Sequence, residues 1–286
     1  MKKIETLCLS GGGIKSIGIL GVLKKLEELH ENNKIILNIK EICCISAGCV
    51  YGLGYILGFT SDEFKHESMI KDFNEFNDFK YYNFLLTYGF DSGRNLISWI
   101  EQMMIKKGFD VNCTFKELYD KTSIKYNVLA TNLTTCTYTI FNHINTPDVK
   151  ITKAIRLSIS IPLYFSAETY NNDIHVDGAI IDNYPIKLYN NDLTNVLGIK
   201  TVNHGENPDD IVQNKTDSIY TFIKNVIYCF LIHKERDTTV SELYKNHTIY
   251  LNVNNNSALT LFLNNDEKTE LFQNGYEKCN DFFNQL

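Results

Sequence analysis

Two short apolar segments of this chain each run directly into small residues and then into a helix pattern. Residues 6–10 lead into three consecutive glycines at 11–13, and residues 41–45 lead into Ser-Ala-Gly at 46–48. After each turn, apolar residues recur every three or four positions, which is the spacing of an amphipathic helix. Two strand–turn–helix units in succession favour a parallel sheet with crossover helices. The sequence therefore predicts an α/β fold with a mostly parallel core.

Further patterns extend this prediction along the chain. The stretch 63–107 is aromatic and polar with a helical pattern, and we expect it to cover the sheet as a cap. No Pro/Ser/Gly-rich linker and no repeat divides the 286 residues, which favours one domain, with its core at 6–200 and a helix–strand–helix completion at 201–286. We expect strands at 126–131, 138–142, 174–177, 195–200 and 248–253, and helices at 149–160, 218–233 and 267–284.

The composition excludes several classes of protein. The formal net charge is −6, so no general positive field would attract nucleic acid, and any membrane contact should be peripheral, local and largely apolar. The eight cysteines include no C-x-x-C pair, which argues against a zinc site or a disulfide framework and favours a reducing cytoplasm. We see no signal peptide and no apolar run near the roughly 20 residues that span a bilayer.

The first candidate site is the pentapeptide Cys44-Ile45-Ser46-Ala47-Gly48, a near match to the G-x-S-x-G nucleophile elbow. An elbow places its serine on a sharp strand-to-helix turn, so that the hydroxyl stands clear of the sheet. The residues two before and two after the serine must be small, which Gly48 satisfies fully and Cys44 only in part. A buried turn of small residues without chemistry is the alternative interpretation.

The second candidate site is the glycine-rich loop 10–16, between the first strand and its helix. Backbone N–H groups of such a loop can stabilise a negatively charged oxygen. A Walker A loop would need glycine before Lys15, where Ile14 stands, and glycine in place of Leu9. A dinucleotide fingerprint would need glycine in place of Ser16. An oxyanion-binding loop and a simple tight turn remain open.

The third candidate site is Asp177-Gly178-Ala179, directly after the predicted strand at 174–176. An aspartate at a strand end, followed by small residues, can point into a cleft. The alternative is an ordinary turn aspartate that bonds its own backbone.

The order of the three sites resembles that of the patatin-like phospholipases, and the segments 126–133 and 154–165 are also similar to that family. The resemblance implies a three-layer α/β/α sandwich and a Ser–Asp dyad without histidine, metal or other cofactor. Carried over, Ser46 is the nucleophile and Asp177 the base. The oxyanion hole is then formed by the amides of Gly11, Gly12 and Gly13, with Cys44, Gly48, Lys15, Ser16, Gly178 and Ala179 as supporting motif residues.

Three residues depart from the family pattern. Cys44 replaces the first elbow glycine, Ser16 replaces the last glycine of the loop, and Ala179 stands where many members have glycine. None of these changes removes a reacting group. A histidine-based triad is a weaker alternative, because His204, His233 and His247 fall in no motif and His175 is at most a neighbour of Asp177.

The sequence thus predicts a lipid acyl hydrolase of the phospholipase A type, which cleaves fatty-acyl ester bonds of membrane glycerolipids through an acyl-enzyme. The alternatives are a catalytically silent lipid-binding protein of the same fold and a nucleotide-binding protein. An apolar rim is expected, and the segments 64–90 and 220–231 are its candidates, although such stripes are more often core. The oligomeric state, the lipid head group and the chain preference have no sequence signal.

Overall fold

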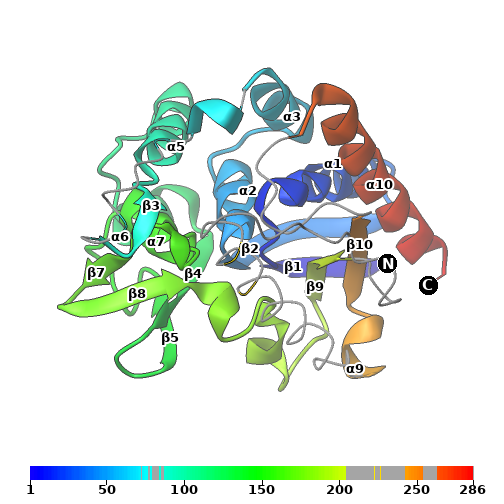
Figure 1. Ribbon diagram of the computed structural model, residues 1–286. Helices are drawn as coiled ribbons and strands as arrows, with labels where there is room; N and C mark the ends of the chain where they lie inside the picture. Colours follow the sequence, from blue (N-terminus) through cyan, green and yellow to red (C-terminus); the bar gives the residue numbers. More distant parts are fainter. Residues whose placement is uncertain are drawn as a thin grey trace.

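A computed structural model describes residues 1–71, 73–76, 78, 84, 87–203, 222, 226, 242–253 and 263–285. Its central sheet has the strand order β10-β9-β1-β2-β4-β8-β7, with β5 also paired to β4 (Figure 1). The strands of this sheet are β1 (Lys2–Leu9), β2 (Ile35–Ile45), β4 (Lys125–Asn132), β5 (Thr137–Phe141), β7 (Glu168–Tyr170), β8 (Asp173–Asp177), β9 (Val196–Asn203) and β10 (Thr248–Val253).

The sheet is parallel through its middle and antiparallel at one end. The pairs β1–β2, β1–β9, β9–β10 and β2–β4 are parallel, whereas β4–β5, β4–β8 and β7–β8 are antiparallel. The predicted α/β fold with a mostly parallel sheet is therefore confirmed. Ile45 lies beside Leu129, and Ala130 lies beside Asp177. This register brings the end of β2 and the end of β8 to the same place on β4.

The last residues of β1 and β2, Leu7–Leu9 and Ile42–Ile45, are buried on both faces of the sheet, which explains why these short segments are continuously apolar. In β1, Leu7 and Leu9 pack on one face and Cys8 on the other, and β2 alternates in the same way. Helices α1 (Gly18–Glu31), α2 (Ala47–Ile56) and α10 (Asn265–Asn284) cover the first face. The short helices η4 (Pro185–Tyr189) and α9 (Glu242–Lys245) contact the second face.

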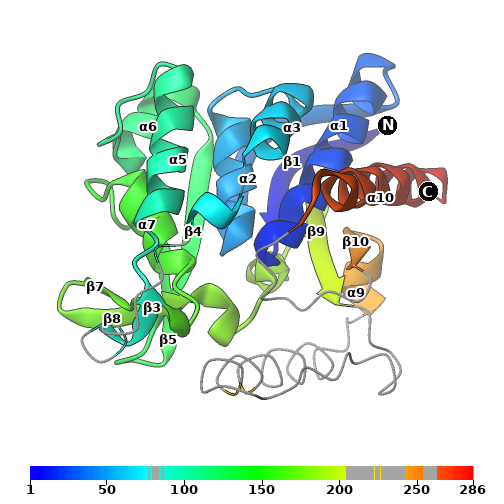
Figure 2. The same ribbon diagram turned by 45° about the horizontal axis from the view of Figure 1, so that its top comes forward.

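The predicted cap region is more varied than its helical pattern indicated. It forms α3 (Ser61–Ile70), η2 (Phe73–Phe76) and α5 (Arg94–Lys106), but also the strand β3 (Gly89–Asp91). β3 pairs with β6 (Leu163–Phe165) in a separate two-stranded sheet, so a distant partner decides its conformation. Helices α6 (Phe115–Thr122) and α7 (Ile151–Ser158) group with α5 next to β4 (Figure 2).

The predicted strands at 126–131, 138–142, 174–177, 195–200 and 248–253 and the helices at 149–160 and 267–284 all appear, with boundaries shifted by a few residues. Most of the predicted helix 218–233 and part of the aromatic stretch 64–90 lie outside the described residues. Within the described ranges, the structure contains no helix whose length and hydropathy would suit a bilayer crossing.

Two isoleucines of β2 test how much the two-sided burial contributes to stability. Ile42 is fully buried, whereas Ile36 is 40% exposed. We expect Ile42→Ala to lower the free energy of unfolding by about 2–5 kcal/mol, because it removes buried methyl groups and leaves a cavity. The matched change Ile36→Ala should cost about 0.5 kcal/mol or less. Urea denaturation of both variants measures the difference, and equal losses would contradict the assignment of Ile42 to the core.

Candidate active site

Ser46 lies between β2 and α2, in the strand–turn–helix arrangement that an elbow requires. Its backbone has φ 52° and ψ −129°, a strained conformation for a residue with a side chain, and such strain often accompanies function. The Ser46 N–H donates to Ser158 Oγ at 2.9 Å, which helps to hold this conformation. A Cβ atom on Gly48 would lie 2.6 Å from the carbonyl oxygen of Ser10, so glycine is needed where α2 passes β1.

Asp177 is the last residue of β8 and contacts Ser46 directly. Ser46 Oγ donates to Asp177 Oδ2 at 2.6 Å, and the Ala179 N–H donates to Asp177 Oδ1 at 2.8 Å. The Asp177 N–H donates to the Ser160 carbonyl oxygen, also at 2.8 Å. Ser46 is 6% exposed and Asp177 2% exposed. The hydroxyl and the carboxylate therefore form a buried, hydrogen-bonded pair.

The surroundings of Asp177 make its carboxylate a stronger base. Burial raises its pKa from 3.8 to about 6, because a charged carboxylate is less stable away from water. The hydrogen bonds from Ser46 and Ala179 lower the pKa but do not offset burial. A base with a pKa closer to neutrality is better matched to accept a hydroxyl proton.

The glycine loop lies against Ser46. The Gly11 N–H donates to Asn183 Oδ1 at 3.1 Å, and Asn183 Nδ2 donates to the Gly11 carbonyl oxygen at 3.2 Å. A Cβ atom on Gly11 would lie 2.9 Å from Ser46 Cβ, so there is no room for a side chain at this position. Gly12 and Gly13 make no N–H hydrogen bond to the described part of the chain. The Gly11 amide, which the family resemblance assigns to the oxyanion hole together with those of Gly12 and Gly13, is thus bonded to Asn183 and helps to fix the loop.

The supporting motif residues occupy several environments. Cys44 is fully buried, and its Sγ donates to the Asn127 carbonyl oxygen at 3.3 Å. Lys15 and Ser16 are both buried in η1 (Gly13–Ile17), and Ser16 Oγ has no hydrogen-bond partner among the described residues. Gly178 and Ala179 open η3 (Gly178–Ile180) directly after Asp177.

The described histidines have other contacts. His175 is buried on β8, and its Nε2 lies 2.8 Å from Thr139 Oγ1 while its Nδ1 lies 3.1 Å from the Asp173 carbonyl oxygen. Both ring nitrogens are thus engaged with residues other than Ser46 and Asp177. His247 Nδ1 lies 3.3 Å from the carbonyl oxygen of Val196, at the start of β9 and so at the opposite edge of the sheet from Ser46. His204 and His233 lie outside the described residues.

An apolar cavity opens beside Ser46. Its walls come from the glycine loop, α2, η2, β3, α5 and the segment 159–165. Apart from two tyrosines and Trp99, the polar side chains in this lining are those of Ser46 and Asp91. The lining residues are Gly13, Ile14, Ser46, Ala47, Val50, Tyr51, Phe76, Asp91, Leu96, Trp99, Ile159, Ile161, Tyr164 and Phe165.

Sequence reasoning missed several residues of this site. Ser158 and Ser160 lie within the segment 154–165, which drew attention only through its resemblance to a family. Asn183 and Asp91 had no sequence signal, because their importance depends on contacts with distant parts of the chain.

Known proteins are similar to this chain in sequence. The family model described as patatin-like phospholipase matches residues 7–188. A probable lipid hydrolase, 463L, from Invertebrate iridescent virus 6 is 31% identical over 202 residues, which make up 65% of this chain and 63% of the viral protein. An uncharacterized protein, R571, from Acanthamoeba polyphaga mimivirus is 29% identical over 261 residues, 88% of this chain and 84% of that protein.

Two solved structures share the fold at low sequence identity. VipD from Legionella pneumophila has a TM-score of 0.60 and 14% identity, and the match covers 99% of this chain and 67% of VipD. The type III effector ExoU has a TM-score of 0.55 and 14% identity, and the chain spans 53% of its length.

The raised pKa of Asp177 predicts a pH dependence for the reactivity of Ser46. If Asp177 is the base that activates this hydroxyl, labelling of Ser46 by a fluorophosphonate should fall about tenfold per pH unit below the pKa of about 6, because only the ionised carboxylate can accept the proton. Above this pKa the rate should level off. Labelling rates measured from pH 4.5 to 8.5 test this, and a profile without a limb near pH 6 would exclude Asp177 as the activating base.

The same pKa predicts an effect on stability. A carboxyl whose pKa is raised on folding stabilises the protein most below its unfolded pKa of 3.8, and this contribution is lost as the pH rises through about 6. We therefore expect Asp177→Asn to raise the free energy of unfolding at pH 8 by up to roughly 3 kcal/mol. The gain should shrink at pH 5. Melting temperatures at both pH values measure it, and a pH-independent difference would contradict the prediction.

Proposed function

Because the chain belongs to the patatin-like phospholipase family, we propose that it hydrolyses fatty-acyl ester bonds of membrane glycerolipids, with Ser46 as nucleophile and Asp177 as general base. The observation that carries this proposal is the 2.6 Å hydrogen bond from Ser46 Oγ to a buried carboxylate, at a serine that lines an apolar cavity. The sequence similarity to a probable lipid hydrolase supports the same class of reaction.

Asp177 Oδ2 takes the hydroxyl proton as Ser46 Oγ attacks the ester carbon. An alcohol is a weak nucleophile until a base removes its proton, and here the base already accepts that proton in a hydrogen bond. The attack places a negative charge on the former carbonyl oxygen. The Gly12 and Gly13 amides stabilise this charge, and each such donor is typically worth about 2.7–4 kcal/mol. Asn183 holds the loop in place through Gly11.

The intermediate then collapses and releases the lysolipid. Protonated Asp177 returns its proton to the departing alcohol oxygen, and the acyl group stays on Ser46 as an ester. Water enters, Asp177 removes one of its protons, and the resulting nucleophile attacks the acyl carbon. Ser46 leaves with the proton from Asp177, and a free fatty acid is formed. Each step uses the carboxylate alternately as base and acid.

The apolar cavity holds the acyl chain during these steps. Its walls include the side chains of Val50, Trp99 and Phe165, which offer contacts to a hydrocarbon. Burial of each methylene group contributes about 0.8 kcal/mol. A site for an acyl chain next to the nucleophile places the ester carbon within reach of Ser46, and the head group then extends away from the cavity.

We expect Ser46→Ala and Asp177→Asn each to lower turnover of acyl lipids by about 1,000-fold or more, because each removes a group that takes part in bond making or proton transfer. The matched control Asp182→Asn should keep activity within about threefold. Asp182 lies five residues from Asp177, and its carboxylate pairs with Lys187 at 2.7 Å. Release of fatty acid from a panel of phospholipids and neutral glycerides, with and without chelator, measures these effects.

The same assay separates hydrolysis from the alternatives. A folded wild-type protein that binds acyl-lipid vesicles but releases no fatty acid from any member of the panel would indicate a silent lipid-binding protein. Full activity in Asp177→Asn would exclude the dyad. Activity that disappears in chelator and returns only with a metal ion would also contradict the proposed mechanism, since the carboxylate acts on the serine directly.

A further inference from the structure

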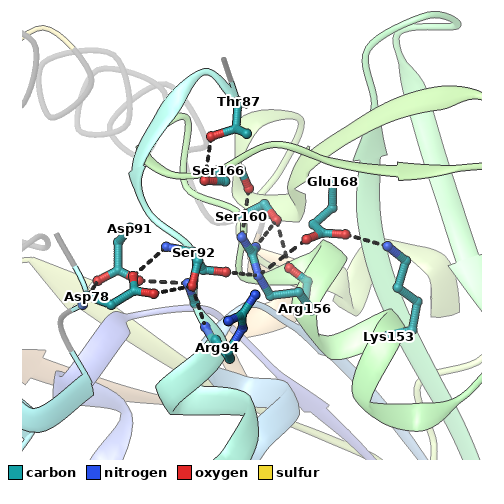
Figure 3. A network of polar contacts seen from close by, with 11 residues as sticks. Asp78, Thr87, Asp91, Ser92, Arg94, Lys153, Arg156, Ser160, Ser166 and Glu168 are labelled. Atoms are coloured by element: carbon teal, nitrogen blue, oxygen red, sulfur yellow. Dashed lines mark hydrogen bonds and ion pairs between the residues drawn. The ribbon is translucent and has the colours of Figure 1, made fainter. Parts of the chain in front are cut away.

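A buried arginine lies at the centre of a polar network that joins α7 to the segments around Ser92 and Ser166 (Figure 3). Arg156, on α7, is 5% exposed, and its guanidinium group makes three hydrogen bonds in three directions. Nε donates to the Ser92 carbonyl oxygen at 3.0 Å, Nη1 to Ser160 Oγ at 2.6 Å, and Nη2 to the Ser166 carbonyl oxygen at 2.8 Å. The group therefore joins the turn at the end of α7 to Ser166 and to the distant segment that contains Ser92.

The charge of Arg156 is compensated on two sides. Glu168 Oε1 lies 3.9 Å from Arg156 Nε, and Glu168 also pairs with Lys153. The carboxylates of Asp91 and Asp78 lie on the other side and favour the charged guanidinium. Asp91 is itself fixed by the N–H groups of Gly93 at 2.7 Å and Asp78 at 2.9 Å. A buried cation with this many partners is costly to replace.

Arg156 reaches the proposed dyad through the turn at the end of α7. Ser160 Oγ accepts from Arg156 Nη1 and donates to the Arg156 carbonyl oxygen at 2.7 Å. The carbonyl oxygen of Ser160 accepts the N–H of Asp177, and Ser158 Oγ accepts the N–H of Ser46. The turn 158–160 therefore contacts the base and the nucleophile at the same time.

We propose that Arg156 is a positioning residue, which holds the turn 158–160 so that Asp177 Oδ2 stays within hydrogen-bonding distance of Ser46 Oγ. This inference rests on the proposed function of the dyad. Arg156 touches neither reacting atom, and it acts through Ser160. A displacement of about 1 Å in a catalytic group can lower a rate by about 100-fold.

A lysine cannot replace the guanidinium in this role. Its single ammonium group has no planar fork, so it cannot donate in the three fixed directions in which Ser92, Ser160 and Ser166 lie. Arg156→Lys keeps the charge and most of the stem, and thus separates positioning from simple charge compensation.

The test compares Arg156→Lys with Arg94→Lys, a matched change at an exposed arginine in the same region (Figure 3). The readouts are kcat and KM per site, after titration of reactive serines, and the rate constant for labelling of Ser46 by a small fluorophosphonate without an acyl chain. We expect Arg156→Lys to lower kcat and the labelling constant in parallel by about 100-fold, with KM changed by about threefold or less. Arg94→Lys should stay within about twofold.

Normalisation to reactive sites separates positioning from stability. A variant that is only less stable has fewer competent molecules, but each of them labels at the normal rate. If Arg156→Lys lowers the melting temperature and leaves the labelling constant within about threefold of wild type, the role is structural and the proposal is wrong.

Ser160→Ala provides an independent test if Arg156→Lys fails to fold. It removes the Oγ that accepts from Arg156 but keeps the carbonyl oxygen that accepts from Asp177. We expect the labelling constant to fall about tenfold, and an unchanged constant would overturn the proposal. The labelling measurement also separates the hypothesis about Arg156 from the proposed function. If Ser46 of the wild type labels but no acyl lipid is hydrolysed, the proposed function fails while the role of Arg156 is still measured.

Discussion

The basicity of Asp177 toward Ser46 Oγ depends on the exclusion of water from its carboxylate. In water an aspartate is a weak base, because solvent stabilises its charge. Burial among β2, β4 and η3 removes that solvent and raises the pKa of Asp177 to about 6. Charge in the interior is unfavourable, so the fold must supply compensating hydrogen bonds. Ser46 and Ala179 provide them, and in doing so they also fix where the two carboxylate oxygens point.

The proposed dyad lacks the third group that orients the base in a serine triad. Here the backbone takes over that task. The Ala179 N–H fixes Oδ1 of Asp177, and the Ser160 carbonyl oxygen fixes its N–H. Ser158 Oγ in turn accepts the N–H of Ser46 and donates to the Leu129 carbonyl oxygen at 2.6 Å. The relative position of Ser46 and Asp177 therefore depends on contacts with β4, β8 and the end of α7.

Much of this fold could be predicted from the sequence, because periodicity and small residues are local signals. The strand–turn–helix units around residues 11–13 and 46 and the strand before Asp177 followed from such signals. Register was not accessible in this way. Only the pairing of Ala130 with Asp177, beside that of Leu129 with Ile45, shows why the end of β8 meets the end of β2. For the same reason the local pattern predicts helix where β3 lies, since the partner strand β6 is more than seventy positions away in sequence.

The hydrogen bonds of the network around Arg156 could not be predicted from local sequence either. Arg156 lies in a segment that looks like an ordinary amphipathic helix, and nothing local indicates that its guanidinium reaches Ser92 and Ser166. Asn183 likewise contacts Gly11 across 172 positions of sequence. Hydrogen bonds between distant segments depend on the completed fold, whereas helix and strand patterns depend on neighbours. Residues that act through such contacts therefore stay hidden until the structure is known.

One departure from the family pattern, Cys44, can be understood from where space is limited at the elbow. At the elbow, the tight approach occurs at Gly48, where an added Cβ would lie 2.6 Å from the Ser10 carbonyl oxygen. Cys44 instead directs its Sγ toward the Asn127 carbonyl oxygen on β4, in the apolar core. The volume allowed at position 44 is thus set by packing between β2 and β4, which accommodates a small thiol. The strain of the elbow resides in the positive φ of Ser46, and that conformation is present with cysteine at position 44.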